Sequence, residues 1–322
     1  MKSRLIHGLG VCILTLGGVK SATAQQPGQF EQPMAPSPAV APARAGRPPE
    51  TRPAAAPFTL TAEQEDYLNQ VLAAWEAHTS KIKTFRCEFT RWTYQPGFIA
   101  AEHPQFKDEP GLQSDGEIKY AAPDKGTFKV TEVRRLNVNT GKYDVTKDEV
   151  GEHWVSTGDA IYEYDAKLKQ VIKRPIPLEM RGRAISDGPL PFLFGAEAEK
   201  LKRRYFLRIV TPKEFSETEI WVDAFPRFRG DAANFKRSVL RLKRESFEPF
   251  AMRLYDPGNG YSSYEFRSVQ INDSVLDKIR DAFKPPLVPF GWRLVVEDNS
   301  AGAQPPGTHQ PTAHRPQQGN PR

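Results

Sequence analysis

The sequence predicts a mainly β fold of the α+β type: a curved antiparallel sheet forming an unclosed half-barrel, with helices on its concave side. Three observations support this prediction. Apolar residues recur at every second position in many short runs, turn-forming residues separate the runs, and helical periodicity is confined to two or three segments. Because strands do not alternate regularly with helices, a doubly wound parallel sheet is disfavoured.

The first periodic segment is helical. Thr61-Ala-Glu-Gln64 has the sequence of a capping box, in which the side chains of both end residues bond to backbone N–H groups. Apolar residues follow at helical spacing, at Leu68, Val71, Leu72 and Trp75. A helix to about residue 79 is therefore expected, with one apolar face packed against the sheet.

From Lys81 the apolar period changes to two, which marks the change from helix to strand. After a strand-poor connection at 95–114, further strands are expected at 116–121, 127–136, 153–156, 160–165, 169–174, 205–210, 217–223, 238–244, 250–256 and 261–269. Thr157-Gly-Asp159 and Asp256-Pro-Gly-Asn-Gly260 are typical hairpin turns. Residues 196–202 should be helical, and Asp273 is expected to cap a short helix.

The composition predicts four parts. Residues 1–24 resemble a secretory signal, with Lys2 and Arg4 before a short apolar stretch and Ala22-Thr-Ala24 before the cut, although a retained anchor is an alternative. Residues 25–57 and 299–322 are rich in Pro, Ala and Gln and are expected to be disordered. Residues 58–298, about 240 in number, form one domain. The predicted location is periplasmic or extracytoplasmic.

Cysteine and charge restrict the function further. Once the signal is removed, Cys87 is the one remaining cysteine, so no intrachain disulfide forms, and a buried position on the face of Phe85 and Phe89 is expected. The net charge of +6 is modest. Basic runs at 200–204 and 236–244 suit anionic membrane surfaces or acidic envelope proteins, but a solvated face is the simpler interpretation. Nucleic acid is not an expected partner.

Motifs for catalysis are missing from the sequence. The six histidines show no metal-ligand spacing, and the chain has neither a Gly-x-Ser-x-Gly elbow nor a Walker-type loop. We therefore predict that the protein is not an enzyme and needs no cofactor or metal.

Apolar and aromatic residues on the strands fit two interpretations: an ordinary core beneath helices, or a cavity left by helices that cover the sheet incompletely. Each methylene moved from water into such a cavity gains about 0.8 kcal/mol, so a long acyl chain could gain on the order of 12 kcal/mol. A register shift of one residue would turn the apolar side chains of any one strand from the concave face to the outer face. The candidate cavity residues are Phe89, Ile118, Tyr120, Phe128, Ile161, Tyr162, Tyr164, Val171, Phe192, Phe194 and Leu254.

The order of several motifs resembles that of the LolA-like periplasmic lipoprotein carriers. These motifs are Phe85-Arg-Cys-Glu-Phe89, Gly116-Glu-Ile-Lys-Tyr-Ala-Ala-Pro123, Val155-Ser-Thr-Gly-Asp-Ala-Ile-Tyr-Glu-Tyr164, Pro191-Phe-Leu-Phe194, Ser262-Ser-Tyr-Glu-Phe266 and Phe283-Lys-Pro-Pro286. The resemblance covers nearly all of residues 61–286. It implies a half-barrel whose concave face binds acyl chains under a helical lid.

Two features depart from the carrier pattern. The carriers place an arginine that ties down the lid where this chain has Ala122, and the connections at 95–114 and 224–235 are longer. In these connections and in its Pro-rich leader the chain resembles a secreted branch described from planctomycete bacteria. Fold therefore transfers from the resemblance better than function does.

The first functional hypothesis is a binding or carrier protein that sequesters lipid or lipoprotein acyl chains. The alternative is an envelope protein-interaction module with a filled core and no ligand. A void beneath the helices would favour the first hypothesis, and a filled core would favour the second.

Overall fold

The computed structural model describes residues 54–95, 103–146, 151–178, 181–182, 193, 197–273 and 281–297. The expected signal, most of the Pro-rich linker and the tail lie outside these residues. So do Phe192, Phe194 and the short helix expected after Asp273. No helix in the described part of the chain is long and apolar enough to cross a membrane.

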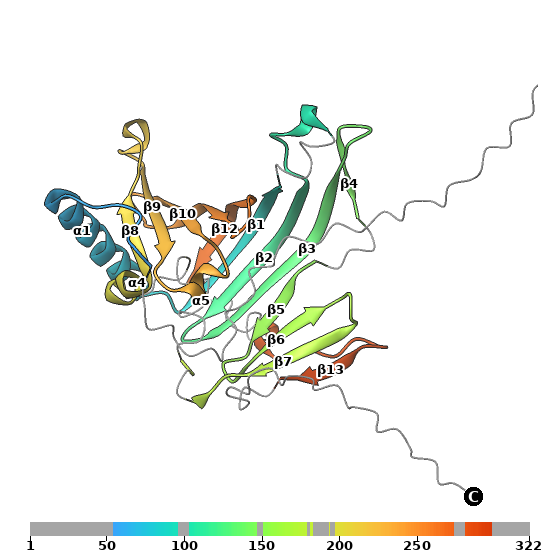
Figure 1. The fold of residues 1–322 in the computed structure, drawn as a ribbon. Coiled ribbons are helices and arrows are strands. Elements are labelled where there is room, and N and C mark those ends of the chain that lie inside the picture. The colour runs from blue at the N-terminus through green and yellow to red at the C-terminus, as the bar shows by residue number, and fades with distance from the viewer. Residues whose placement is uncertain are drawn as a thin grey trace, which may run out of the picture. The chain divides into compact units, whose positions relative to one another are not determined.

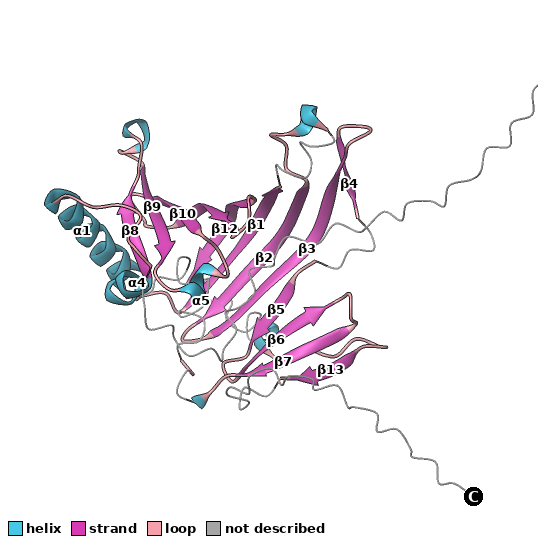
Figure 2. Cartoon of the chain, in the orientation of Figure 1, coloured by secondary structure: helices cyan, strands magenta, loops and turns pink. Residues whose placement is uncertain are grey.

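The described residues form mostly strands, with a few short helices (Figures 1 and 2). The helices are α1 (Ala62–Thr79), η1 (Pro104–Phe106), α4 (Ala198–Arg204), η3 (Lys213–Phe215), α5 (Arg229–Ala232) and η4 (Asp281–Phe283). The strands are β1 (Thr84–Tyr94), β2 (Leu112–Ala121), β3 (Lys125–Asn137), β4 (Lys142–Val145), β5 (His153–Ser156), β6 (Ala160–Asp165), β7 (Gln170–Pro175), β8 (Tyr205–Ile209), β9 (Glu219–Pro226), β10 (Arg237–Lys243), β11 (Pro249–Tyr255), β12 (Tyr261–Ile271) and β13 (Arg293–Val296).

All thirteen strands belong to one open sheet with the order β13-β7-β6-β5-β3-β2-β1-β12-β11-β10-β9-β8, and β4 pairs with β3. The predicted class, a curved unclosed half-barrel with helices, is confirmed. One pairing differs from the expectation of a fully antiparallel sheet: β13 runs parallel to β7, with Leu294 opposite Val171. The sequence analysis did not predict β13 or β4.

The N-terminal helix forms for the predicted reasons. The Thr61 hydroxyl accepts a hydrogen bond from the Gln64 backbone N–H at 3.3 Å, and the Thr61 N–H donates to the Gln64 side chain at 3.0 Å. Both bonds of the capping box are therefore present. The apolar stripe that includes Leu72 and Trp75 is buried, and both of these side chains are about 1 % exposed.

The helix and one face of the sheet share the main hydrophobic core. We call this face the apolar face; its strands contribute alternate residues such as Phe89, Ile118, Phe128 and Leu240. Cys87 also lies here, fully buried as expected, and burial raises the pKa of its thiol far above the usual range. The core therefore lies between α1, α4 and the sheet.

Both predicted hairpins are present. Trp154 pairs with Glu163 across the β5–β6 hairpin. The β11–β12 hairpin closes through a 3.0 Å bond from the Asp256 N–H to the Gly260 carbonyl. The expected helix at 196–202 is α4, two residues later, and β2 begins at Leu112, inside the connection that was expected to lack strands.

A second apolar cluster lies on the other side of the β5–β7 strands. It contains Ala160, Tyr162 and Val171, with Tyr164 and Trp292 packed against it. The His153 ring stacks on Tyr164 with the ring centroids 4.3 Å apart. Burial and the nearby Lys129 charge lower the pKa of His153 to about 4.

This histidine predicts a loss of stability in mild acid. The unfolded chain, with an imidazole pKa of 6.5, binds a proton between pH 6.5 and about 4 that the folded chain does not bind. The free energy of unfolding should therefore fall as the pH decreases through this window, by about 2 kcal/mol at about pH 5. Urea unfolding at several pH values should show this loss in the natural protein. A His153→Phe variant keeps the ring stack and should lose less stability; an identical pH dependence would contradict the assignment.

Candidate functional site

The structure brings only some of the predicted cavity residues together. Phe89, Ile118, Phe128 and Leu254 belong to the main core on the apolar face. Phe89 is fully buried and stacks on Phe128 with the ring centroids 4.8 Å apart, and Phe128 stacks in turn on Trp154 at 6.1 Å. These side chains fill the space around one another.

The other predicted residues lie elsewhere. Tyr162, Tyr164 and Val171 belong to the second cluster, on the opposite face of the sheet from Trp154. Ile161 lies at the edge of the apolar face, outside the main core. Tyr120 is half-buried, and its hydroxyl donates to the Pro123 carbonyl at 3.2 Å. The nine candidates that lie within the described residues therefore do not all share one face of the sheet.

A charged pair, for which the sequence analysis made no prediction, is buried within the apolar face. Arg91 donates to the Glu152 carboxylate at 2.9 Å, and their side chains are 15 % and 11 % exposed. Burial raises the pKa of Glu152, while the adjacent guanidinium acts in the opposite direction. Arg91 also lies 6.0 Å from the centre of the buried Tyr264 ring. Because core side chains enclose the pair, it belongs to the core and not to an open binding site.

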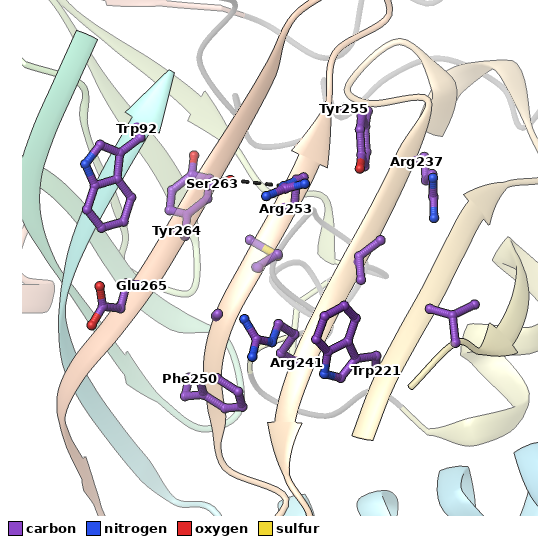
Figure 3. A pocket seen from close by; sticks show the side chains of 14 residues that line it. Trp92, Trp221, Arg237, Arg241, Phe250, Arg253, Tyr255, Ser263, Tyr264 and Glu265 are labelled. Atoms are coloured by element: carbon purple, nitrogen blue, oxygen red, sulfur yellow. Dashed lines mark hydrogen bonds between the residues drawn. The ribbon is translucent and has the colours of Figure 1, made fainter. Parts of the chain in front are cut away.

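A hollow of about 590 Å³ lies on the face opposite the core, across strands β9 to β12 and β1 (Figure 3). We call it the trough. Its small floor residues are Val239, Ala251 and Ser263, which are cross-strand neighbours of arginines or Trp92. Large side chains stand on either side of this floor; the aromatic ones that belong to this face are Trp92, Trp221, Phe250 and Tyr255, and Tyr264 of the core also borders the hollow. Strand register therefore builds a channel with a small-residue floor and aromatic walls.

Three arginines lie among these aromatic walls. Arg241 stacks between Trp221 and Phe250, at 4.5 and 4.8 Å from the ring centres. Its guanidinium also donates to Glu219 at 2.8 Å. Arg237 lies 5.1 Å from the Tyr255 ring. Cation–π contacts and ion pairs therefore hold both guanidinium groups in place.

The acid that holds Arg237 is buried beneath the trough. Asp223 is fully buried and accepts from Arg237 at 2.7 Å and from Arg208 at 2.8 Å. Two cations therefore share one carboxylate, which leaves a positive excess at this end of the trough.

Arg253 differs from the other two arginines. It is exposed, donates to the Ser263 hydroxyl at 3.1 Å and lies 5.0 Å from the Tyr261 ring. Within the described residues it forms no ion pair. Glu265 also lines the trough, as the cross-strand neighbour of Ala251. It too forms no ion pair with a described residue. A guanidinium that forms no ion pair, beside a mostly apolar hollow, suits a ligand with an anionic group and an apolar body.

The sequence analysis did not find the trough. The basic run at 236–244 was interpreted as a solvated face, because arginines at alternate positions of a strand are typical of one. The signal that could have identified it is the repeated alternation of Arg with aromatic residues on neighbouring strands, which one strand alone does not show.

Within the described residues, no group of three or more His, Cys, Asp or Glu side chains is arranged to hold a metal ion. Besides guanidinium, aromatic and aliphatic side chains, the trough is lined by the Ser263 hydroxyl and the Glu265 carboxylate.

Comparisons with known proteins give matches in structure only. No protein family matches the chain, and no curated protein matches it. Among solved structures, an uncharacterised conserved protein from Thermus thermophilus matches at 8 % identity and a TM-score of 0.37, covering 71 % of this chain and 99 % of that one. A DUF1329 family protein from Desulfovibrio piger matches at 9 % and 0.37, covering 70 % and 100 %.

The matching structures also include LolA superfamily protein NE2245 from Nitrosomonas europaea, at 11 % identity and a TM-score of 0.34, covering 68 % of this chain and 97 % of that one. This is the superfamily whose motifs the sequence resembles. TM-scores below 0.5 carry no conclusion about function, so the proposals below depend on the residues of this chain.

Proposed function

We propose that the protein is an extracytoplasmic lipid-binding protein that sequesters an acyl chain in the trough. The observation that carries the proposal is a hollow of about 590 Å³ with aromatic walls, a floor of small residues and arginines along its length. Its size lies within the range of about 300–1,000 Å³ that is typical of small-molecule sites.

Apolar burial supplies the binding energy. The aromatic walls and the small floor offer mostly apolar surface, and each methylene moved there from water contributes up to about 0.8 kcal/mol. Burial of only part of an acyl chain is therefore sufficient for binding without any specific polar contact.

Arg253 supplies the polar recognition. Its guanidinium faces the trough without an ion pair among the described residues, and Arg237 lies on the neighbouring strand, opposite Tyr255. Carboxylate and phosphate groups are the anions that a guanidinium recognises best. The preferred ligand is therefore an amphiphile with an anionic headgroup: a free fatty acid, a phospholipid or a lipoprotein's lipid.

Native mass spectrometry of protein purified from its own envelope should reveal a bound lipid. After delipidation, an anionic fatty-acid fluorophore should bind again. Ala251→Trp fills the floor of the trough and should weaken this binding at least about tenfold, and Arg253→Ala should weaken binding of the anionic probe more than that of its uncharged ester. Lys129→Trp places the same indole at an exposed position of β3 and serves as the control.

Unchanged binding by Ala251→Trp would contradict the proposal for the trough. A photoactivatable fatty acid then distinguishes the sites: label on peptides of β10 and β11 supports the trough. Label on peptides around Phe128 or Tyr162 would mean that the acyl chain binds instead at the apolar positions proposed from sequence periodicity.

A second candidate function is an envelope protein-interaction module without a ligand. The stacking of Phe89, Phe128 and Trp154 favours it, because these side chains fill the part of the core where a cavity was expected. A delipidated protein that binds neither lipid nor probe, yet retains a protein partner from the envelope, would favour this candidate.

A further inference from the structure

An exposed apolar loop precedes β13. Phe290 is fully exposed, with a relative accessibility of 106 %, and Leu287 is 91 % exposed. Val288 between them is 38 % exposed. Exposure of several large apolar side chains in one short loop is costly in water and typically marks a contact surface.

A second exposed leucine lies next to this loop. The β6–β7 turn carries Lys167-Leu168-Lys169, in which Leu168 is 60 % exposed. The turn and the loop are joined by a 3.1 Å bond from the Arg293 N–H to the Lys169 carbonyl, and Arg293 pairs with Gln170 in the parallel ladder. Leu168 and the exposed apolar loop therefore belong to one corner of the sheet.

Basic side chains surround these apolar points. Lys167, Lys169 and Arg293 are exposed, and none forms an ion pair with another described residue. Asp165, in the same turn, accepts the Leu168 N–H at 2.9 Å, and its single negative charge is outnumbered by the three cations. The corner therefore combines projecting apolar side chains with a positive excess.

We propose that this corner docks on the surface of an anionic lipid bilayer. We define the docking corner as Lys167–Lys169 together with residues 287–293. A bilayer interface offers both of the required environments: an acyl boundary that accepts Phe290, Leu287 and Leu168, and anionic headgroups that attract the lysines and Arg293. The charge complementarity favours this partner over a second copy of the chain, whose corner would carry the same positive excess.

Flotation with vesicles tests the proposal. The protein should bind vesicles that contain phosphatidylglycerol, bind phosphatidylcholine vesicles weakly, and release the anionic vesicles as salt increases. Phe290→Ser and Leu287→Ser should each lower the partition coefficient about tenfold. Lys167→Glu combined with Lys169→Glu should lower it at least as much. Leu178→Ser is the matched control, because Leu178 is 77 % exposed but follows the other end of β7.

Phe290→Trp adds a direct reading of the contact, since its fluorescence should shift to the blue on anionic vesicles. The proposal is overturned if the natural protein ignores anionic vesicles at low salt, or if Leu178→Ser lowers binding as much as Phe290→Ser. It is also overturned if sedimentation shows an oligomer that Phe290→Ser dissociates, because the corner would then join copies of the chain. Failure of lipid binding in the trough leaves these outcomes unchanged.

Discussion

Replacement of Glu152 by glutamine is expected to lower the free energy of unfolding by about 3–5 kcal/mol. The substitution removes the charge that compensates Arg91, whose guanidinium then remains buried among Phe89, Tyr264 and their neighbours. A buried charge without its partner costs several kcal/mol because it has lost its hydration. Equilibrium unfolding in urea at neutral pH measures the effect.

The double variant Arg91→Met/Glu152→Leu is the control for this prediction. It removes both charges and replaces them with apolar side chains, so it should be more stable than either single variant. Single variants with losses below about 1 kcal/mol would mean that water reaches the pair, and the description of a buried pair would be wrong. The pair of exposed Lys243 with half-buried Glu248, at 2.7 Å, should contribute at most about 1 kcal/mol and gives the comparison for a contact near the surface.

Replacement of Phe89 by alanine is the second substitution with a large expected effect, about 3–5 kcal/mol of the free energy of unfolding. Phe89 is fully buried, and its ring contacts Phe128 and Tyr264 with centroid distances of 4.8 and 5.9 Å. The ring also leaves no room at the facing Gly116, where an added Cβ would lie 2.4 Å from it. Thermal or urea unfolding measures the loss.

Trp92→Ala is the matched variant on the other face of β1. Trp92 is half-buried and lines the trough, so its removal should cost less stability and should weaken binding of an acyl-chain probe. If Phe89→Ala abolished probe binding in a protein that was still folded while Trp92→Ala bound normally, the ligand would lie on the apolar face.

Local features of the fold were predictable because their causes lie within a few residues. The capping box at Thr61 and Gln64 determines where α1 begins. The two hairpin turns need glycine, because Gly158 has a φ of +93° and a Cβ at Gly260 would lie 2.9 Å from the Tyr94 carbonyl oxygen. Alternation also placed Phe85, Cys87 and Phe89 together on the buried face.

Features that depend on distant strands were not predictable. Ile161 and Tyr162 are consecutive and both apolar, so alternation alone does not tell which of them faces the main core; pairing of β6 with β5 and β7 decides it. The parallel pairing of β13 with β7 joins segments more than 100 residues apart and has no local signal. The buried Arg91–Glu152 pair also depends on a contact between distant segments.

The trough was missed for the same reason. Arg241, Trp221 and Ala251 come from three strands, and only their register places the guanidinium between aromatic rings and beside a small floor residue. Along the chain, each arginine looks like an ordinary solvent-exposed residue.

The pairing of β1 with β12 also has a consequence for how the chain acquires its structure. This seam joins Thr90 to Arg267 across 177 residues, and β1 lies in the middle of the strand order. The hairpins on either side can form early from nearby segments, but the seam closes only after synthesis has reached β12. Until then Phe89 lacks its contacts with β12, including the Tyr264 ring and its pairing with Phe266. The nascent chain therefore stays incompletely folded for most of its synthesis, a state in which chaperones can hold it.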